Sequence, residues 1–194
     1  MSESAGLPMN TSTWNRGRVG MACLIFGESS FFSVFVVAYL FYIGKSATGP
    51  QPAEVLEFPA LATLCLLSSS VSAGVAVKAL ARGNRTRTAL GLAATVALGS
   101  AFIVQTALEW ARLMADHGLT IGTNLFGTTF YSLVGFHAAH VILGLLMLSL
   151  VLGLALGGRV RQEHSERVEM VTWYWHFVDA VWIVVVTTVY IVGV

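Results

Sequence analysis

The chain has 194 residues, of which 56% are hydrophobic and 11% are charged, with 11 Lys and Arg against 10 Asp and Glu. Ordinary soluble domains carry roughly 25% charged residues, so this chain has too few charges to cover a surface that faces water. The net charge of +1 supplies no basic patch for nucleic acid, and two cysteines cannot form a disulfide scaffold. Composition therefore argues against a soluble enzyme, a nucleic-acid-binding protein and a disordered chain, and it predicts a multi-span membrane protein.

The hydropathy pattern divides the chain into a polar start and five apolar stretches. Residues 1–18 are polar, and we interpret them as a short cytoplasmic lead-in to a single transmembrane domain over residues 19–194. They do not form a cleavable signal peptide, because the apolar run after Arg18 is too long and no small-residue cleavage site follows. A helix needs about 20 mostly apolar residues to cross a bilayer. The predicted fold is an all-α bundle of five transmembrane helices, at residues 19–43, 59–80, 89–113, 126–156 and 171–192.

The basic residues predict the orientation, since cytoplasmic loops carry an excess of Lys and Arg. If the first span starts in the cytoplasm, Lys45 and Arg112 fall on the outer side. The remaining basic residues then fall on the inner side: Arg16, Arg18, Lys78, Arg82, Arg85, Arg87, Arg159, Arg161 and Arg167. The N-terminus is therefore predicted in the cytoplasm and the C-terminus outside. Tryptophans near span ends are typical of aromatic belts, and here they are Trp14, Trp110, Trp173 and Trp175.

Five ionisable side chains fall inside the predicted spans: Glu28, His137, His140, His176 and Asp179. A charge at mid-bilayer costs roughly 2.5–3.5 kcal/mol on insertion scales, so such residues face a bundle interior by default. His137 and His140 are three residues apart, as are His176 and Asp179, so each pair projects from one helix face. At about 1.5 Å per residue, Glu28, His140 and Asp179 fall at similar depths and could share one layer.

Three interpretations fit these polar residues. The first is a metal or haem site, although the spans contain no Glu-x-x-His pair, and His137 and His140 lie on one helix where a haem would need two. The second is a proton or ion pathway through Glu28, although neither broken helices nor repeated halves are evident. The third is a buried network that fixes helix packing through hydrogen bonds of about 1 kcal/mol each. The residues alone favour the third.

Small residues in the second span predict close helix packing, inside the chain or against a partner subunit. They are Ser68, Ser69, Ser70, Ser72, Ala73 and Gly74, and the fourth span adds Gly153 and Gly157. Cys23 and Cys65 fall at different depths, farther apart than the about 7 Å that a disulfide allows between Cα atoms, so we expect inert, buried thiols.

Charged residues outside the apolar stretches have simpler interpretations. Glu109 and Arg112 are three residues apart, and this spacing permits a local ion pair at the outer end of the third span. The mixed charges of residues 159–169 predict a solvated cytoplasmic loop, which would face the lipid head groups.

Several runs of residues resemble subunit III of the haem-copper oxidases. The run WYWHFVD at residues 173–179 looks like the C-terminal signature of that subunit, and residues 127–141, from GTTFY to His140 and Val141, match it too. Residues 26–32, FGESSFF, are similar to the segment that carries a buried glutamate, although here Ser follows Glu28 rather than preceding it. LLSSSV at residues 66–71 matches the second shared helix. The resemblance therefore covers the chain after the lead-in, in the right order.

This resemblance implies a setting that composition and spacing do not show. The chain resembles the short five-helix form of the family, which lies in the bacterial cytoplasmic (inner) membrane. Longer members of the family have seven spans. The resemblance implies direct contact with oxidase subunit I, with subunit II and a small subunit IV as further partners, and no nucleic acid. Haem and copper are then expected on the partner subunits and not on this chain. Phospholipid is expected in the cleft of a V-shaped helix assembly.

The resemblance also implies roles for individual residues. The glutamate that matches Glu28 is buried and not required for pumping, and the histidines that match His137, His140 and His176 belong to an interior polar network. We therefore expect Glu28 to be neutral or hydrogen-bonded to a histidine, with His140 as the first candidate. Lipid or subunit packing is expected at Ser68, Ser69, Ser70, Ser72, Gly74, Trp173 and Trp175.

The expected function follows from these implications. The chain would be a non-redox subunit of a respiratory terminal oxidase, supporting subunit I in oxygen reduction and proton pumping, with either cytochrome c or quinol as electron donor. The alternatives are a subunit III-like partner of a nitric oxide reductase, a stand-alone channel or transporter, and a metal- or haem-binding membrane enzyme.

Overall fold

A computed structural model describes residues 16–46 and 48–194. Within these residues the secondary structure is helical, with no strand. The long helices are α1 (Arg16–Tyr42), α3 (Ala60–Ala81), α4 (Arg85–His117), α5 (Leu125–Leu156) and α6 (Ser165–Val186). Each is long and apolar enough to cross a membrane, α6 together with its extensions over residues 162–192. The predicted all-α fold with five membrane-length helices is confirmed, whereas most of the lead-in, with Trp14, lies outside the described residues.

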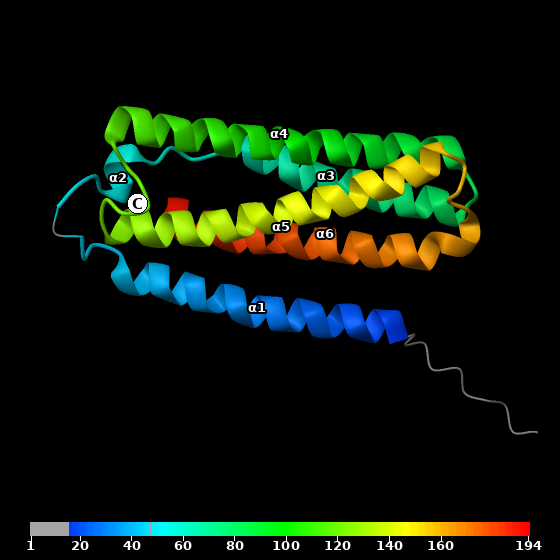
Figure 1. The fold of residues 1–194 in the computed structure, drawn as a ribbon, viewed down its shortest axis with the longest axis horizontal. Coiled ribbons are helices and arrows are strands. Elements are labelled where there is room, and N and C mark those ends of the chain that lie inside the picture. Colours follow the sequence, from blue (N-terminus) through cyan, green and yellow to red (C-terminus); the bar gives the residue numbers. More distant parts are fainter. Residues whose placement is uncertain (1–15, 47) are drawn as a thin grey trace, which may run out of the picture.

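Each long helix runs antiparallel to the long helix before it in the sequence (Figure 1). Helix α3 packs on α4 and α6, and α5 packs on α4 and α6, so these helices form a four-helix unit. Helix α1 lies along the edge of this unit, and its main contacts are with α5 and α6 (Figure 1). The two ends of the bundle therefore carry all the connections.

Local signals in the sequence set the helix ends. Asn84 begins α4, where its side-chain oxygen accepts a hydrogen bond from the backbone N–H of Arg87 at 3.0 Å. Gly118 ends α4 in the left-handed conformation, with φ of 61°. Asn124 caps α5 in the same way as Asn84, and its amide group donates to the backbone oxygens of Thr48 and Pro50 at 3.1 and 3.0 Å. Asn124 therefore also holds the connection after α1 against the start of α5.

Several boundaries differ from those predicted. The connection 44–58 contains a one-turn helix, α2 (Pro52–Val55), where the sequence predicts only turns. Helix α4 extends beyond residues 89–113 in both directions, because its caps lie outside the apolar stretch. The charged segment 159–169 is not a loop throughout, since the 3₁₀ turn η1 (Gln162–His164) leads directly into α6. At its other end α6 continues as the π-helix η2 (Thr187–Val192).

Trp175 is the centre of the four-helix core. Its side chain is fully buried, and its indole Nε1 donates to the hydroxyl of Ser69 at 2.9 Å. The ring fills space that two glycines leave open: a Cβ on Gly99 would lie 2.8 Å from it, and one on Gly144 would lie 2.7 Å from it. Helices α4 and α5 therefore approach α6 closely because these two positions have no side chain.

The two cysteines do not pair, as expected, but only one of them is enclosed. Cys65 on α3 is half-buried, and its Sγ lies 3.7 Å from Nε2 of Gln105. Cys23 on α1 is exposed, so the prediction of a buried thiol is wrong there. Helix α1 is apolar on nearly every side, and hydropathy alone does not indicate which side faces the bundle.

Candidate functional site

Glu28 on α1 and His140 on α5 form the only direct contact among the five ionisable side chains described above. The carboxylate Oε2 of Glu28 lies 3.2 Å from Nε2 of His140. On the other side of the ring, Nδ1 lies 2.8 Å from the backbone oxygen of Phe136. The sequence-based expectation that His140 is the partner of Glu28 is confirmed at the level of this contact.

The hydrogen bonds of the His140 ring limit the protonation states of the pair. A carbonyl oxygen only accepts, so Nδ1 carries a proton and donates it to Phe136. If the ring is neutral, Nε2 accepts a hydrogen bond from a protonated Glu28; if the ring is charged, Nε2 donates a hydrogen bond to a carboxylate. In both cases the pair carries no net charge. A net-neutral pair is what a membrane interior tolerates best.

Aromatic rings surround the pair. The ring centroid of His140 lies 5.0 Å from that of Phe32 and 4.6 Å from that of Phe136. Phe31 and Phe35 extend this cluster along α1, at 4.9 and 5.2 Å from Phe136. The aromatic cluster of residues 31, 32, 35 and 136 therefore joins α1 to α5 and keeps the hydrogen-bonded pair in apolar surroundings.

His137 is fully buried and behaves as an aromatic core residue. Its ring stacks on Trp182 with a centroid distance of 5.1 Å and an interplanar angle of 28°, and it meets the edge of Phe102 at 5.9 Å. Neither ring nitrogen has a hydrogen-bond partner among the described residues. His137 therefore lies one turn from His140 without joining the Glu28 pair.

His176 and Asp179 on α6 lie in a different part of the bundle, facing α3. Nδ1 of His176 is hydrogen-bonded to the hydroxyl of Ser70, which also lies within reach of the Asp179 carboxyl. Asp179 is only 3% exposed, and its oxygens make no hydrogen bond of ordinary geometry to the described residues. The five ionisable residues are thus divided between two places, and hydrogen bonds among the described residues do not link them into one network.

Some serine side chains of α3 point into the bundle, and others point away from it. Ser69 is fully buried and accepts from Trp175, and Ser72 is hydrogen-bonded to Thr95 of α4 at 2.8 Å. Ser68 points outward and is exposed. The small-residue patch of α3 therefore serves packing inside this chain on one side and remains open on the other.

The two tryptophans expected to pack on lipid or a partner differ. Trp173 is half-buried, and the guanidinium of Arg18 lies 5.9 Å from its ring centroid. Arg18 also pairs with Glu169 at 3.1 Å, so the starts of α1 and α6 are tied together. Trp175 is fully buried, so it packs inside this chain and is not an aromatic-belt residue.

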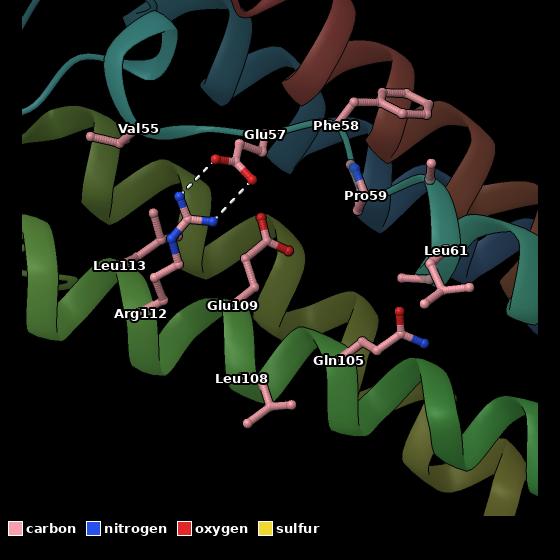
Figure 2. Close-up of a pocket in the computed structure, with 12 residues that line it drawn as sticks. Val55, Glu57, Phe58, Pro59, Leu61, Gln105, Leu108, Glu109, Arg112 and Leu113 are labelled. Carbon is pink, nitrogen blue, oxygen red and sulfur yellow. Dashed lines mark hydrogen bonds and ion pairs between the residues drawn. The ribbon is translucent and has the colours of Figure 1, made fainter.

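A second polar cluster lies at the opposite end of the bundle from Arg18. Figure 2 shows the Arg112 guanidinium facing both carboxylate oxygens of Glu57, at 3.0 and 2.7 Å. This hydrogen-bonded guanidinium lowers the pKa of the Glu57 carboxyl. Glu109 instead accepts from the hydroxyl of Tyr190 at 3.1 Å, so the predicted local pair of Glu109 with Arg112 is wrong. Nothing local predicts the observed pair, because its members are 55 residues apart.

These outer residues line a cavity of about 420 Å³ between α4 and the segment that leads into α3. Gln105, Glu109 and Arg112 line it from α4, and Glu57 and Pro59 line it from the other side (Figure 2). Nη1 and Nη2 of Arg112 both donate to the Glu57 carboxylate. Over the described part of the chain, no three His, Cys, Asp or Glu side chains come together as metal ligands do.

Comparison with known proteins identifies the family. A family model described as cytochrome c oxidase subunit III matches residues 2–194. The chain belongs to the cytochrome c oxidase subunit III family. Membership makes it a multi-pass membrane component of an oxidase complex.

Named relatives of the subunit III family align over most of their length. Cytochrome c oxidase subunit 3 of Alkalihalophilus pseudofirmus is 32% identical over 170 residues, which are 87% of this chain and 82% of the relative. The proteins of the same name from Pelomedusa subrufa and Lemur catta are each 34% identical, over 92% and 93% of this chain and 70% and 68% of their own lengths. The family predicted from the WYWHFVD run is confirmed.

Proposed function

We propose that this chain is a non-redox subunit of a respiratory haem-copper oxidase, and that it supports the catalytic subunit I in reducing oxygen and moving protons outward. Haem and copper are carried by the partner subunits. The observation that carries the proposal is the family match over residues 2–194. The geometry agrees with it, since Glu28 and His140 bond to each other and His137 packs as a core ring.

The Glu28–His140 pair braces α1 against the four-helix unit. It lies at the contact of α1 with α5, inside the aromatic cluster, and it carries no net charge whichever partner holds the proton. A residue that bridges two helices in this way fixes their register, because its partner has no alternative hydrogen bond in lipid. The pair therefore acts through helix placement, because it joins α1 to α5.

The chain lies in the bacterial inner membrane with its N-terminal end in the cytoplasm. The basic residues at the start of α1 and between α3 and α4 support this orientation, as do those before α6. A phospholipid chain binds in the apolar groove of about 510 Å³ between α4 and α5, lined by Met114, Gly135 and Ile142. Trp110 and Tyr131 line the same groove in the outer halves of α4 and α5.

The test is to purify the oxidase from cells with and without this chain. We expect the complex without it to keep its haem spectrum, since the cofactors lie elsewhere, but to lose activity faster during turnover, because subunit I lacks its support. Adding the purified chain back should restore the lifetime. Loss of a haem band together with this chain would contradict the proposal, and so would an unchanged lifetime.

A further inference from the structure

His176 is exposed at the middle of the membrane. Among the five ionisable residues it alone is exposed, so the expectation of an interior residue is wrong for His176. Glu28 and His140 are half-buried, and His137 and Asp179 are buried. Its partner Ser70 stands at the midpoint of the 22-residue helix α3, which at about 1.5 Å per residue is as long as the hydrocarbon core is thick. The imidazole therefore opens from the bundle at mid-bilayer depth.

The hydrogen bonds of His176 are incomplete within this chain. Nδ1 is bonded to Ser70, and Nε2 makes no hydrogen bond to any described residue. Lipid tails offer neither a donor nor an acceptor, and a polar group left unpaired in hydrocarbon costs several kcal/mol. A hydrogen-bonding group from outside the described chain is needed to complete the ring's contacts.

The surface around His176 is shaped for a close neighbour. Ala180 is exposed one turn beyond His176 on α6, and Gly74 lies one turn beyond Ser70 on α3, where an added Cβ would meet nothing. Helices α3 and α6 run in opposite directions (Figure 1). Each of these two small residues follows a member of the Ser70–His176 pair by four positions, so they lie on opposite sides of that pair along the bundle axis. Small residues of this kind let a neighbouring helix approach the backbone.

The surface around His176 adjoins a groove between α6 and α1. Ala180 also lines an apolar groove of about 430 Å³ between α1 and α6, together with Phe32, Val36 and Val181. A helix seated against His176 could therefore place apolar side chains in this groove while its own polar group meets the imidazole.

The face of α4 that points away from the bundle differs from the face around His176. Between Arg87 and Glu109 this helix carries no titratable residue. Its exposed side chains there include Leu90, Val104 and Leu108, which lipid tails solvate without cost. Nothing on that side requires a protein partner, in contrast to the face of α3 and α6.

We propose that the face of α3 and α6 around His176, with Gly74 and Ala180, is the docking surface for a transmembrane helix of the haem-bearing partner subunit. That helix places a hydrogen-bonding side chain against Nε2 of His176 at mid-bilayer. The inference rests on the proposed function, which supplies the partner, and it adds the face and the anchoring residue.

The test places a photo-cross-linking amino acid at Ala180, or at Ala97 on the face of α4 that points away from the bundle, in cells that make the whole oxidase. Both positions are exposed alanines in the central part of their helices. We expect position 180 to cross-link to the haem-bearing subunit and position 97 to give lipid adducts only. Cross-links from position 97 in place of 180, or from 180 to a second copy of this chain or to lipid alone, would overturn the docking face. If the chain never co-purifies with a haem-bearing subunit, the proposed function itself fails.

A second measurement tests the hydrogen bond. His176→Leu should lower the retention of this chain on the purified oxidase by about threefold to tenfold as detergent is raised, the range that one interhelical hydrogen bond supplies. His176→Gln keeps a donor and an acceptor and should retain most of the binding. Equal retention of the Leu variant and the unchanged protein would contradict the anchoring role.

Discussion

Helix α1 and the four-helix unit are held by different means. In the most apolar 18-residue stretch of α1, 6% of the residues are buried, against 50% in an 18-residue stretch of the segment 162–192, to which α6 belongs. The buried residues of α1 are Phe32 and Tyr39. Packing around Trp175 stabilises the four-helix unit, whereas α1 depends on the aromatic cluster, the Glu28–His140 pair and the Arg18–Glu169 pair.

The difference shows where polar contacts matter in this bundle. In a membrane, apolar side chains gain little from leaving lipid, so helices associate through packing and interhelical hydrogen bonds. Helix α1 has little packing, and two of its polar contacts, near its start and near its middle, join it to α6 and α5. We therefore expect core substitutions to unfold the unit and α1 substitutions to release one helix.

The largest effect is expected from Trp175→Ala. The substitution leaves a cavity against Gly99 and Gly144 and removes the bond to Ser69, so it should lower the free energy of unfolding by about 3 kcal/mol. Titration with SDS, followed by circular dichroism, measures this change. Trp173→Ala is the control, because that ring is half-buried and its loss should cost much less. Equal effects of the two substitutions would contradict the central place of Trp175.

Phe32→Ala should release α1 without unfolding the rest. Phe32 is 4% exposed and contacts the rings of His140, Phe136 and Phe177. The substitution should remove about 2 kcal/mol of the packing free energy that holds α1 on the four-helix unit. Amide hydrogen exchange in α1 should then be roughly 30-fold faster, while exchange in α3 to α6 is unchanged. Phe26→Ala is the matched control, because that ring lies on the same helix outside the aromatic cluster and is 76% exposed. Faster exchange throughout the bundle would show that α1 is not a separate element.

Glu28→Gln should leave the assembled oxidase nearly intact. A glutamine amide can still pair with Nε2 of His140, so the unfolding free energy should change by less than about 1 kcal/mol. Glu28→Leu removes the pairing and should cost about 1 kcal/mol. The yield of purified complex and the SDS titration report both changes. Loss of the whole complex in the Gln variant would mean that the charge of Glu28 is itself required.

The smallest effect is expected at the exposed Glu57–Arg112 pair. The guanidinium lowers the pKa of Glu57, so the stabilisation is fully present above the ordinary pKa of a glutamate and is lost as the pH falls through the lowered value. The free energy of unfolding should therefore fall slightly between pH 7 and pH 3, and Glu57→Gln should abolish this fall. A loss of the same size in that variant would assign the effect to another carboxylate.

Much of the fold and one contact of the site could be predicted from the sequence. The five spans follow from hydropathy, and depth along the helices allows the Glu28–His140 contact, although depth also places Asp179 in the same layer. Facing direction could not be predicted, because a helix that is apolar on all sides has no marked inner face: Cys23 points outward and Trp175 inward. The Glu57–Arg112 pair was missed because it depends on how a connection folds back over α4.

The most direct test of the central claim is to purify the complex in mild detergent, identify the companions of this chain by mass spectrometry, and then record the visible spectrum and metal content of the separated chain. The account predicts that a haem-bearing subunit travels with the chain, and that the separated chain holds no haem, iron, copper or zinc. A metal bound by His137, His140 or His176, or a chain that purifies without any haem-bearing companion, as a transporter would, contradicts it.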